Sequence, residues 1–61
     1  MRDPERIDKI LAQLGELWKK YPDLRLGQLI GNTGIQQNEL LFYNIEDQEL
    51  INYILEYYNS L

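Results

Sequence analysis

Residues 17–30 read LWKKYPDLRLGQLI, and the helical organisation of the chain depends on this segment. It contains the only Trp, Trp18, and one of the two Pro residues, Pro22. A proline disfavours helical geometry in the residue before it, so a helix that enters this segment is expected to end at Tyr21. Asp23 is a good N-cap for a helix that follows. The segment is therefore predicted to be a hinge between two helices.

The residues before the hinge have the pattern of one amphipathic helix, predicted over 4–21. Asp3 is a good N-cap, Pro4 suits the first helical position, and Glu5 places a negative charge in the first turn. Apolar residues then recur at helical spacing and form one stripe. The stripe consists of Ile7, Ile10, Leu11, Leu14, Leu17, Trp18 and Tyr21.

A shorter second helix is predicted over about 24–32. Gly and Asn residues at its end tolerate the left-handed conformation that often stops a helix. Residues 32–38 are polar and contain Gly, so they are expected to form a loop. The next segment, residues 39–43 (ELLFY), is compatible with a helical turn, an extended segment or the tail of a longer helix.

A third helix is predicted over 45–59. Asn44 can cap it, and Asp47 can complete a capping box in place of the usual Glu. Two adjoining apolar stripes follow, one with Leu50, Ile54, Tyr57 and Leu61 and the other with Ile51, Leu55 and Tyr58. Two short neighbouring helices are not expected to cover so wide a face in a lone small domain. Spare apolar surface of this kind usually marks an interface.

These elements predict an all-α fold in a single helical domain, residues 1–61, with three main helices packed as a small orthogonal bundle. A chain of 61 residues buries only about 60% of the surface that its unfolded form exposes. Domains of this size usually need a disulfide, a metal or a second subunit. The sequence has no Cys and no His, which favours the second subunit. We therefore expect a homodimer to complete the bundle.

The composition excludes most catalytic and metal chemistry. Without Cys or His there is no Ser–His or Cys–His machinery and no usual zinc site, although carboxylates alone could still hold a metal. Glu46, Asp47 and Glu49 cluster, but a negatively charged first helical turn accounts for all three. We expect a protein that is not an enzyme and has no cofactor, catalytic residue or metal site.

The charges are segregated along the chain. The net charge is −4, yet all six Lys and Arg residues lie before Leu26. The remainder has no cation and five acidic residues: Glu39, Glu46, Asp47, Glu49 and Glu56. An anionic half of this kind disfavours a nucleic-acid backbone and favours a basic protein, or a basic face of a sister subunit.

The surface that binds a partner is predicted on the last helix and its acidic start. A Tyr side chain has an apolar ring and a polar hydroxyl, which suits the centre of an interface. Trp18 and Phe42 are expected in the core instead. The predicted partner-binding residues are Tyr53, Tyr57, Tyr58, Glu46, Asp47 and Glu49.

A helix-turn-helix DNA-binding regulator is the alternative, with Gly31 at the turn and Thr33–Phe42 as the recognition stretch. Gln36, Gln37 and Asn38 could hydrogen-bond to adenine. The stretch has no Arg or Lys to neutralise phosphate, however, which argues against this interpretation.

Membrane association is not expected. No apolar run approaches the ~20 residues of a membrane span. The charged N-terminus is also not followed by the apolar run of a signal peptide. We therefore expect a cytoplasmic protein.

Residues 18–32, WKKYPDLRLGQLIGN, resemble a motif of small uncharacterised bacterial and phage proteins, in which Phe-Tyr and an acidic pair precede the last helix. Phe42-Tyr43 and Glu46-Asp47 match those later pieces, but Asn44-Ile45 stands where one apolar residue is expected. A fainter likeness extends to YihD-like domains of unknown function. The resemblance implies no activity but suggests a phage or mobile-element setting. We therefore expect a protein–protein interaction module, in concrete form a phage-encoded inhibitor of a bacterial enzyme or defence protein.

Overall fold

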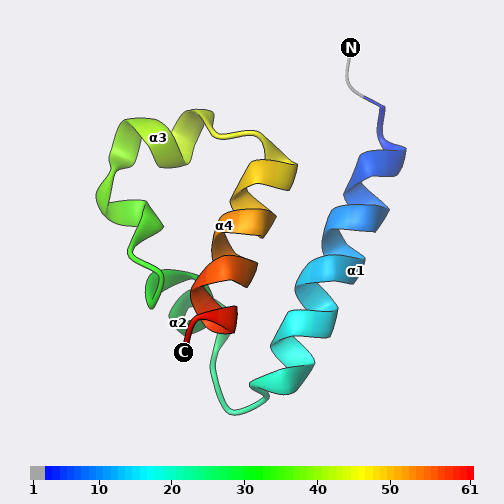
Figure 1. The fold of residues 1–61 in the computed structure, drawn as a ribbon. Coiled ribbons are helices and arrows are strands. Elements are labelled where there is room, and N and C mark those ends of the chain that lie inside the picture. Colours follow the sequence, from blue (N-terminus) through cyan, green and yellow to red (C-terminus); the bar gives the residue numbers. More distant parts are fainter. Residues whose placement is uncertain (1–2) are drawn as a thin grey trace.

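The computed structural model describes residues 3–61, which are folded into helices connected by short turns (Figure 1). The elements in chain order are α1 (Glu5–Lys20), α2 (Leu26–Gly31), the 3-10 turn η1 (Ile35–Gln37), α3 (Glu39–Asn44) and α4 (Asp47–Asn59). These residues contain no β-strand, so the all-α prediction is confirmed.

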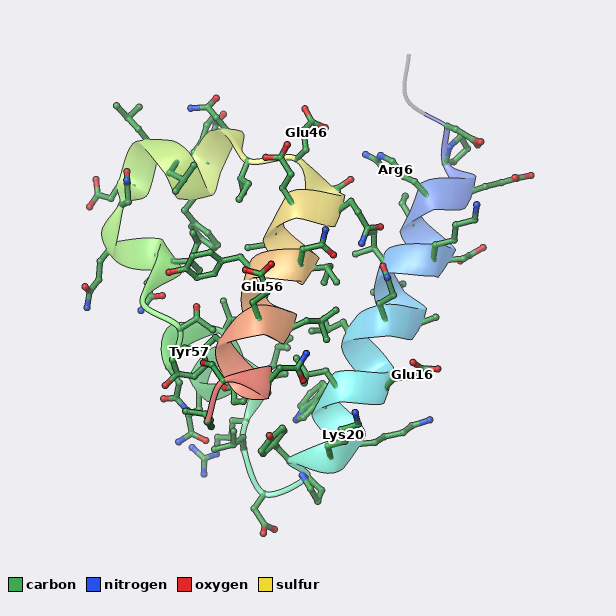
Figure 2. The ribbon with its side chains drawn as sticks, in the orientation of Figure 1. Arg6, Glu16, Lys20, Glu46, Glu56 and Tyr57 are labelled. Carbon is green, nitrogen blue, oxygen red and sulfur yellow. The ribbon has the colours of Figure 1, made fainter. Side chains whose placement is uncertain are left out.

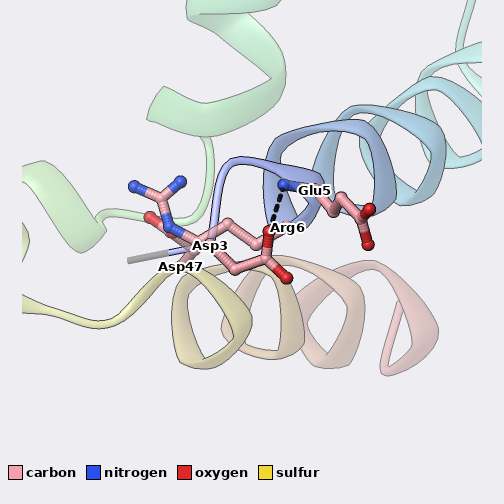
Figure 3. Close-up of polar contacts among 4 residues, drawn as sticks. All are labelled: Asp3, Glu5, Arg6 and Asp47. Atoms are coloured by element: carbon pink, nitrogen blue, oxygen red, sulfur yellow. Dashed lines mark hydrogen bonds and ion pairs between the residues drawn. The ribbon is translucent and has the colours of Figure 1, made fainter. Parts of the chain in front are cut away.

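The first helix has the predicted course to within one residue at each end. The Asp3 carboxylate accepts a hydrogen bond from the backbone N–H of Glu5 at 2.9 Å (Figure 3). This bond satisfies one of the N–H groups that a helix start leaves without an intrahelical partner. At the other end Tyr21 has left helical geometry, as expected for a residue that precedes Pro22.

The hinge between α1 and α2 is longer than predicted, because α2 begins at Leu26 and not near Leu24. The backbone N–H of Leu24 donates to Tyr21 O, and the indole N–H of Trp18 donates to Leu24 O at 2.7 Å. Both bonds hold Leu24 in the turn. The predicted cap, Asp23, therefore precedes the true N-cap, Arg25, by two residues.

The segment between α2 and α4 is helical for much of its length. A turn follows α2, in which Gly34 has a left-handed φ of 78°, and η1 comes directly after it. The Asn38 side chain then accepts a hydrogen bond from Leu41 N at 3.2 Å and caps α3. Of the three conformations considered for residues 39–43, the structure shows a helix.

The predicted cap of the last helix is wrong. Asn44 is the final residue of α3, and its side-chain amide donates to Leu40 O at 2.8 Å. Ile45 and Glu46 are extended, and α4 starts at Asp47. The Asn44–Asp47 capping box therefore does not form, because α3 incorporates Asn44.

Helices α1 and α4 lie side by side and run in the same direction, with α3 on the opposite side of α4 from α1 (Figure 1). Arg6 and Asp47 form an ion pair at 3.2 Å near the start of both helices. Near their ends, the rings of Tyr21 and Tyr58 lie 4.8 Å apart between centroids. Contacts at both ends place these two helices lengthwise against each other.

The core lies where α1, α2 and α4 converge. Its buried centre consists of Leu17, Leu29, Ile54 and Tyr58. Partly buried residues surround it: Leu14, Trp18, Tyr21, Leu24, Ile30, Leu50, Leu55 and Tyr57. The apolar stripe predicted on α1 is only partly used, because Ile7 and Leu11 in its N-terminal half are exposed.

The apolar face of α4 is covered largely within the chain, which corrects the reasoning behind the predicted dimer. Ile51, Ile54 and Tyr58 are buried, and Leu50, Leu55 and Tyr57 are partly buried. Among the residues of the two predicted stripes, only Leu61 is strongly exposed. The last helix therefore does not need a second subunit to cover it.

Candidate protein-binding surface

Among residues 3–61, the helix with the most exposed apolar side chains is α3. None of the six described residues of this helix is buried. Leu40 is 77% exposed and Tyr43 is 88% exposed. Leu41 and Phe42 remain exposed as well, so Phe42 is not the core residue that the sequence predicted.

The geometry of α3 places its two most exposed apolar residues together. Leu40 and Tyr43 are three positions apart and share one face of the helix. The Asn38 cap and the Asn44–Leu40 hydrogen bond hold the helix at its two ends. Its packing is chiefly against the neighbouring turn η1. A short helix supported by local contacts thus presents an apolar pair to solvent.

Acidic side chains lie at both ends of this helix and continue along α4. Glu39 is the first residue of α3 and is exposed, and Glu46, Glu49 and Glu56 are exposed along α4. Figure 2 shows Glu46 where the chain passes from α3 into α4, and Glu56 further along α4. The sequence has no Lys or Arg from Leu26 onward. The surface composed of α3 and these four Glu residues, here called the α3–acidic surface, is therefore apolar and anionic.

Four of the cations belong to α1, which lies on the other side of α4 from α3 (Figure 1). Lys9, Lys19 and Lys20 are exposed on α1, and Figure 2 shows Arg6 and Lys20 on that helix. Arg6 pairs with Asp47, at side-chain exposures of 40% and 41%. The basic first helix thus contacts the acidic start of α4 within one chain, so this contact needs no sister subunit.

The three predicted partner-binding tyrosines have different environments. Tyr58 is buried, and its hydroxyl donates to Leu29 O, so it belongs to the core and not to the surface. Tyr57 is half-buried and packs edge-on against the Tyr58 ring, with centroids 5.0 Å apart. Tyr53 is 41% exposed, although its hydroxyl donates to Thr33 O at 3.3 Å.

The predicted acidic residues lie at the start of α4 but do not converge on one point. Asp47 forms the ion pair with Arg6, while Glu46 precedes the helix as its N-cap and Glu49 is exposed one turn further on. Within residues 3–61, no three acidic side chains are grouped in a way that could hold a metal ion.

No protein-family model, curated protein or solved structure matches the chain. In the part of the chain that the structure describes, no helix is both long enough and apolar enough to cross a bilayer.

The stretch that a helix-turn-helix would use for recognition is divided. Thr33–Phe42 comprises a turn, the 3-10 turn η1 and the first four residues of α3, not one continuous helix. A recognition helix lies in the major groove and presents its side chains from one continuous element. The fold of this stretch does not favour the DNA-binding alternative.

Sequence reasoning missed α3 as a surface, although a signal was present. Asn38 is a good N-cap, and four consecutive large apolar residues, Leu40–Tyr43, follow it closely. Successive helical residues are about 100° apart, so four of them point in directions all around the axis. A helix of six residues against a small core cannot bury all four.

Proposed function

We propose that this protein is a non-enzymatic interaction module that binds another protein through the α3–acidic surface. The observation that carries the proposal is the joint exposure of Leu40 and Tyr43 on one face of α3. Apolar and aromatic side chains that can be buried together are typical anchors of protein interfaces. Glu39 at the start of α3 and Glu46 shortly after its end supply a polar rim.

The charge of this surface supports a basic partner over a second copy of the chain. A closed dimer brings the same patch of both subunits together. Here that contact would place acidic side chains opposite acidic side chains, with no cation in residues 26–61 to compensate. A foreign protein with basic and apolar side chains avoids this repulsion.

Inhibition is the concrete form of this function that the resemblance to bacterial and phage proteins suggests. In this proposal the module acts by occupying a surface of its target and not by chemistry on it. A bacterial enzyme or defence protein with a basic contact surface fits this proposal.

Affinity capture from a bacterial lysate tests the proposal, with the parent chain and the double variant Leu40→Ser/Tyr43→Ser as baits. We expect the parent to retain a specific protein that the double variant loses. Both positions are solvent-exposed, so the variant should keep its helical circular dichroism and its unfolding midpoint.

Leu61→Ser is the matched control, because Leu61 has the same 77% exposure as Leu40 but lies at the chain end, outside α3. It should retain the captured protein. Capture by the double variant at the level of the parent would show that α3 is not the binding surface.

A further inference from the structure

We propose that a hollow on α4, lined by Tyr53, Glu56, Tyr57 and Ser60, receives an arginine side chain of the bound protein. This inference rests on the proposed function and specifies which chemistry of a partner the acidic helix recognises. The hollow lies outside α3, so it can be tested separately from it.

Three of the lining residues belong to α4, and the fourth, Ser60, is its C-cap. Tyr53 precedes Glu56 and Tyr57 by three and four positions, and these precede Ser60 by four and three, so the residues gather on one side of the helix end. The Tyr53 hydroxyl reaches Thr33 O, so this face adjoins the turn that follows α2. Figure 2 shows Tyr57 on the side of α4 away from α1, the helix that carries Lys19 and Lys20.

Both aromatic walls of the hollow are held in place by the fold. Tyr53 is fixed at its hydroxyl by the hydrogen bond to Thr33 O. Tyr57 is fixed at its ring by the edge-on contact with the buried Tyr58. Side chains that are already positioned lose less conformational freedom when a ligand binds.

The chemistry of the lining fits a guanidinium group. Two Tyr rings can stack on its flat face, and the Glu56 carboxylate can accept its N–H donors. The hollow also lies in the last turns of α4, where the helix dipole favours positive charge. No Lys or Arg follows Arg25 in the chain, so α4 itself has no cation to occupy the site.

Titration of the ¹⁵N-labelled chain with N-acetylarginine methylamide tests the inference by NMR. The matched probe is the citrulline analogue, which has nearly the same shape but no charge. We expect the arginine compound to shift the amide signals of residues 53–60 with a Kd on the order of millimolar. The affinity should fall, and the Kd rise, as salt is added. The citrulline compound should cause no saturating shift.

Two pairs of variants locate the effect. Glu56→Gln should weaken binding roughly two- to fivefold, whereas Glu16→Gln removes the same charge from an exposed position of α1, outside the proposed binding surface, and should leave binding unchanged. Tyr53→Leu should weaken binding relative to Tyr53→Phe, because both variants lose the hydroxyl but only the first loses the ring.

Equal shifts with citrulline, or equal losses in the Glu16 and Glu56 variants, would overturn the inference. These outcomes are distinguishable from failure of the proposed function. If α3 captures a protein but arginine does not bind at residues 53–60, the hollow is wrongly assigned and the α3–acidic surface stands. If arginine binds there but no captured protein depends on Leu40 and Tyr43, the hollow is correctly assigned and α3 is not the binding surface.

Discussion

The Tyr58 hydroxyl donates a hydrogen bond to the carbonyl oxygen of Leu29 at 2.5 Å, and this bond joins α4 to α2 across 29 positions of the chain. Leu29 is fully buried, so water cannot replace the donor. In a continuing α-helix the backbone N–H of Thr33 would donate to Leu29 O, but here it donates to Ile30 O in the turn after α2. The Tyr58 hydroxyl therefore takes its place and satisfies the Leu29 carbonyl, one of the groups that a helix end leaves without an intrahelical partner.

Replacement of Tyr58 by Phe should lower the free energy of unfolding by about 1–3 kcal/mol, because the ring remains while the Leu29 carbonyl loses its donor. Urea unfolding followed by circular dichroism measures this. Tyr43→Phe is the control, since that exposed hydroxyl meets solvent, and its effect should stay within about 0.5 kcal/mol. Equal midpoints for the two variants would contradict the structural role of the bond.

The hinge depends on Trp18, whose indole N–H donates to Leu24 O at 2.7 Å. Trp18→Phe keeps an aromatic ring but removes the donor and part of the packing, and should cost about 1–2 kcal/mol. Hydrogen exchange should also show faster exchange at the Leu24 amide, which bonds to Tyr21 O in the turn. If the Leu24 amide stayed as protected as in the parent chain, the indole would not be what holds the hinge.

Gly15 is in the middle of α1, and a Cβ atom built there meets no atom within 4 Å. Gly15→Ala should therefore stabilise the protein by about 1 kcal/mol, through higher helix propensity alone. The opposite effect is expected at Gly34, whose φ of 78° is unfavourable for any residue with a side chain. Gly34→Ala should therefore destabilise the protein by about 1 kcal/mol. Thermal unfolding measures both; a loss of stability in Gly15→Ala would indicate a close neighbour at that position.

The chain should be monomeric at low salt, because α1 and α2 cover α4 and the half of the chain that contains the exposed α3 has only negative charges. Light scattering at micromolar concentration should give a mass near 7.3 kDa. A stable mass of twice that value would restore the homodimer predicted from the sequence. In that case Leu40→Ser/Tyr43→Ser would show whether α3 forms the contact.

Local signals predicted some parts of the fold well. The Asp3–Pro4–Glu5 start and the stop before Pro22 are short-range effects, and both boundaries of α1 agree with the structure to within one residue. The caps of α2 and α4 were misplaced by two residues each. Asp23 and Asn44 are suitable caps locally, but a turn includes the first and α3 includes the second.

The candidate site was predicted less completely. The sequence correctly indicated that some apolar surface lies outside the core, yet placed it on α4, where Tyr58 is in fact buried. Periodicity shows which residues share a helical face but not which neighbour covers that face. The position of α2 decides this, because Leu29 meets Tyr58 only after the hinge has turned the chain back.

The sequence by itself determined the helical class, the first helix, the break at Pro22 and the absence of Cys and His chemistry. Each of these follows from residue types or from neighbours within about one helical turn. Only the tertiary structure decided which tyrosine is buried and that Leu40 and Tyr43 face solvent. Burial depends on contacts between residues far apart in the chain, and no local pattern specifies how those segments meet.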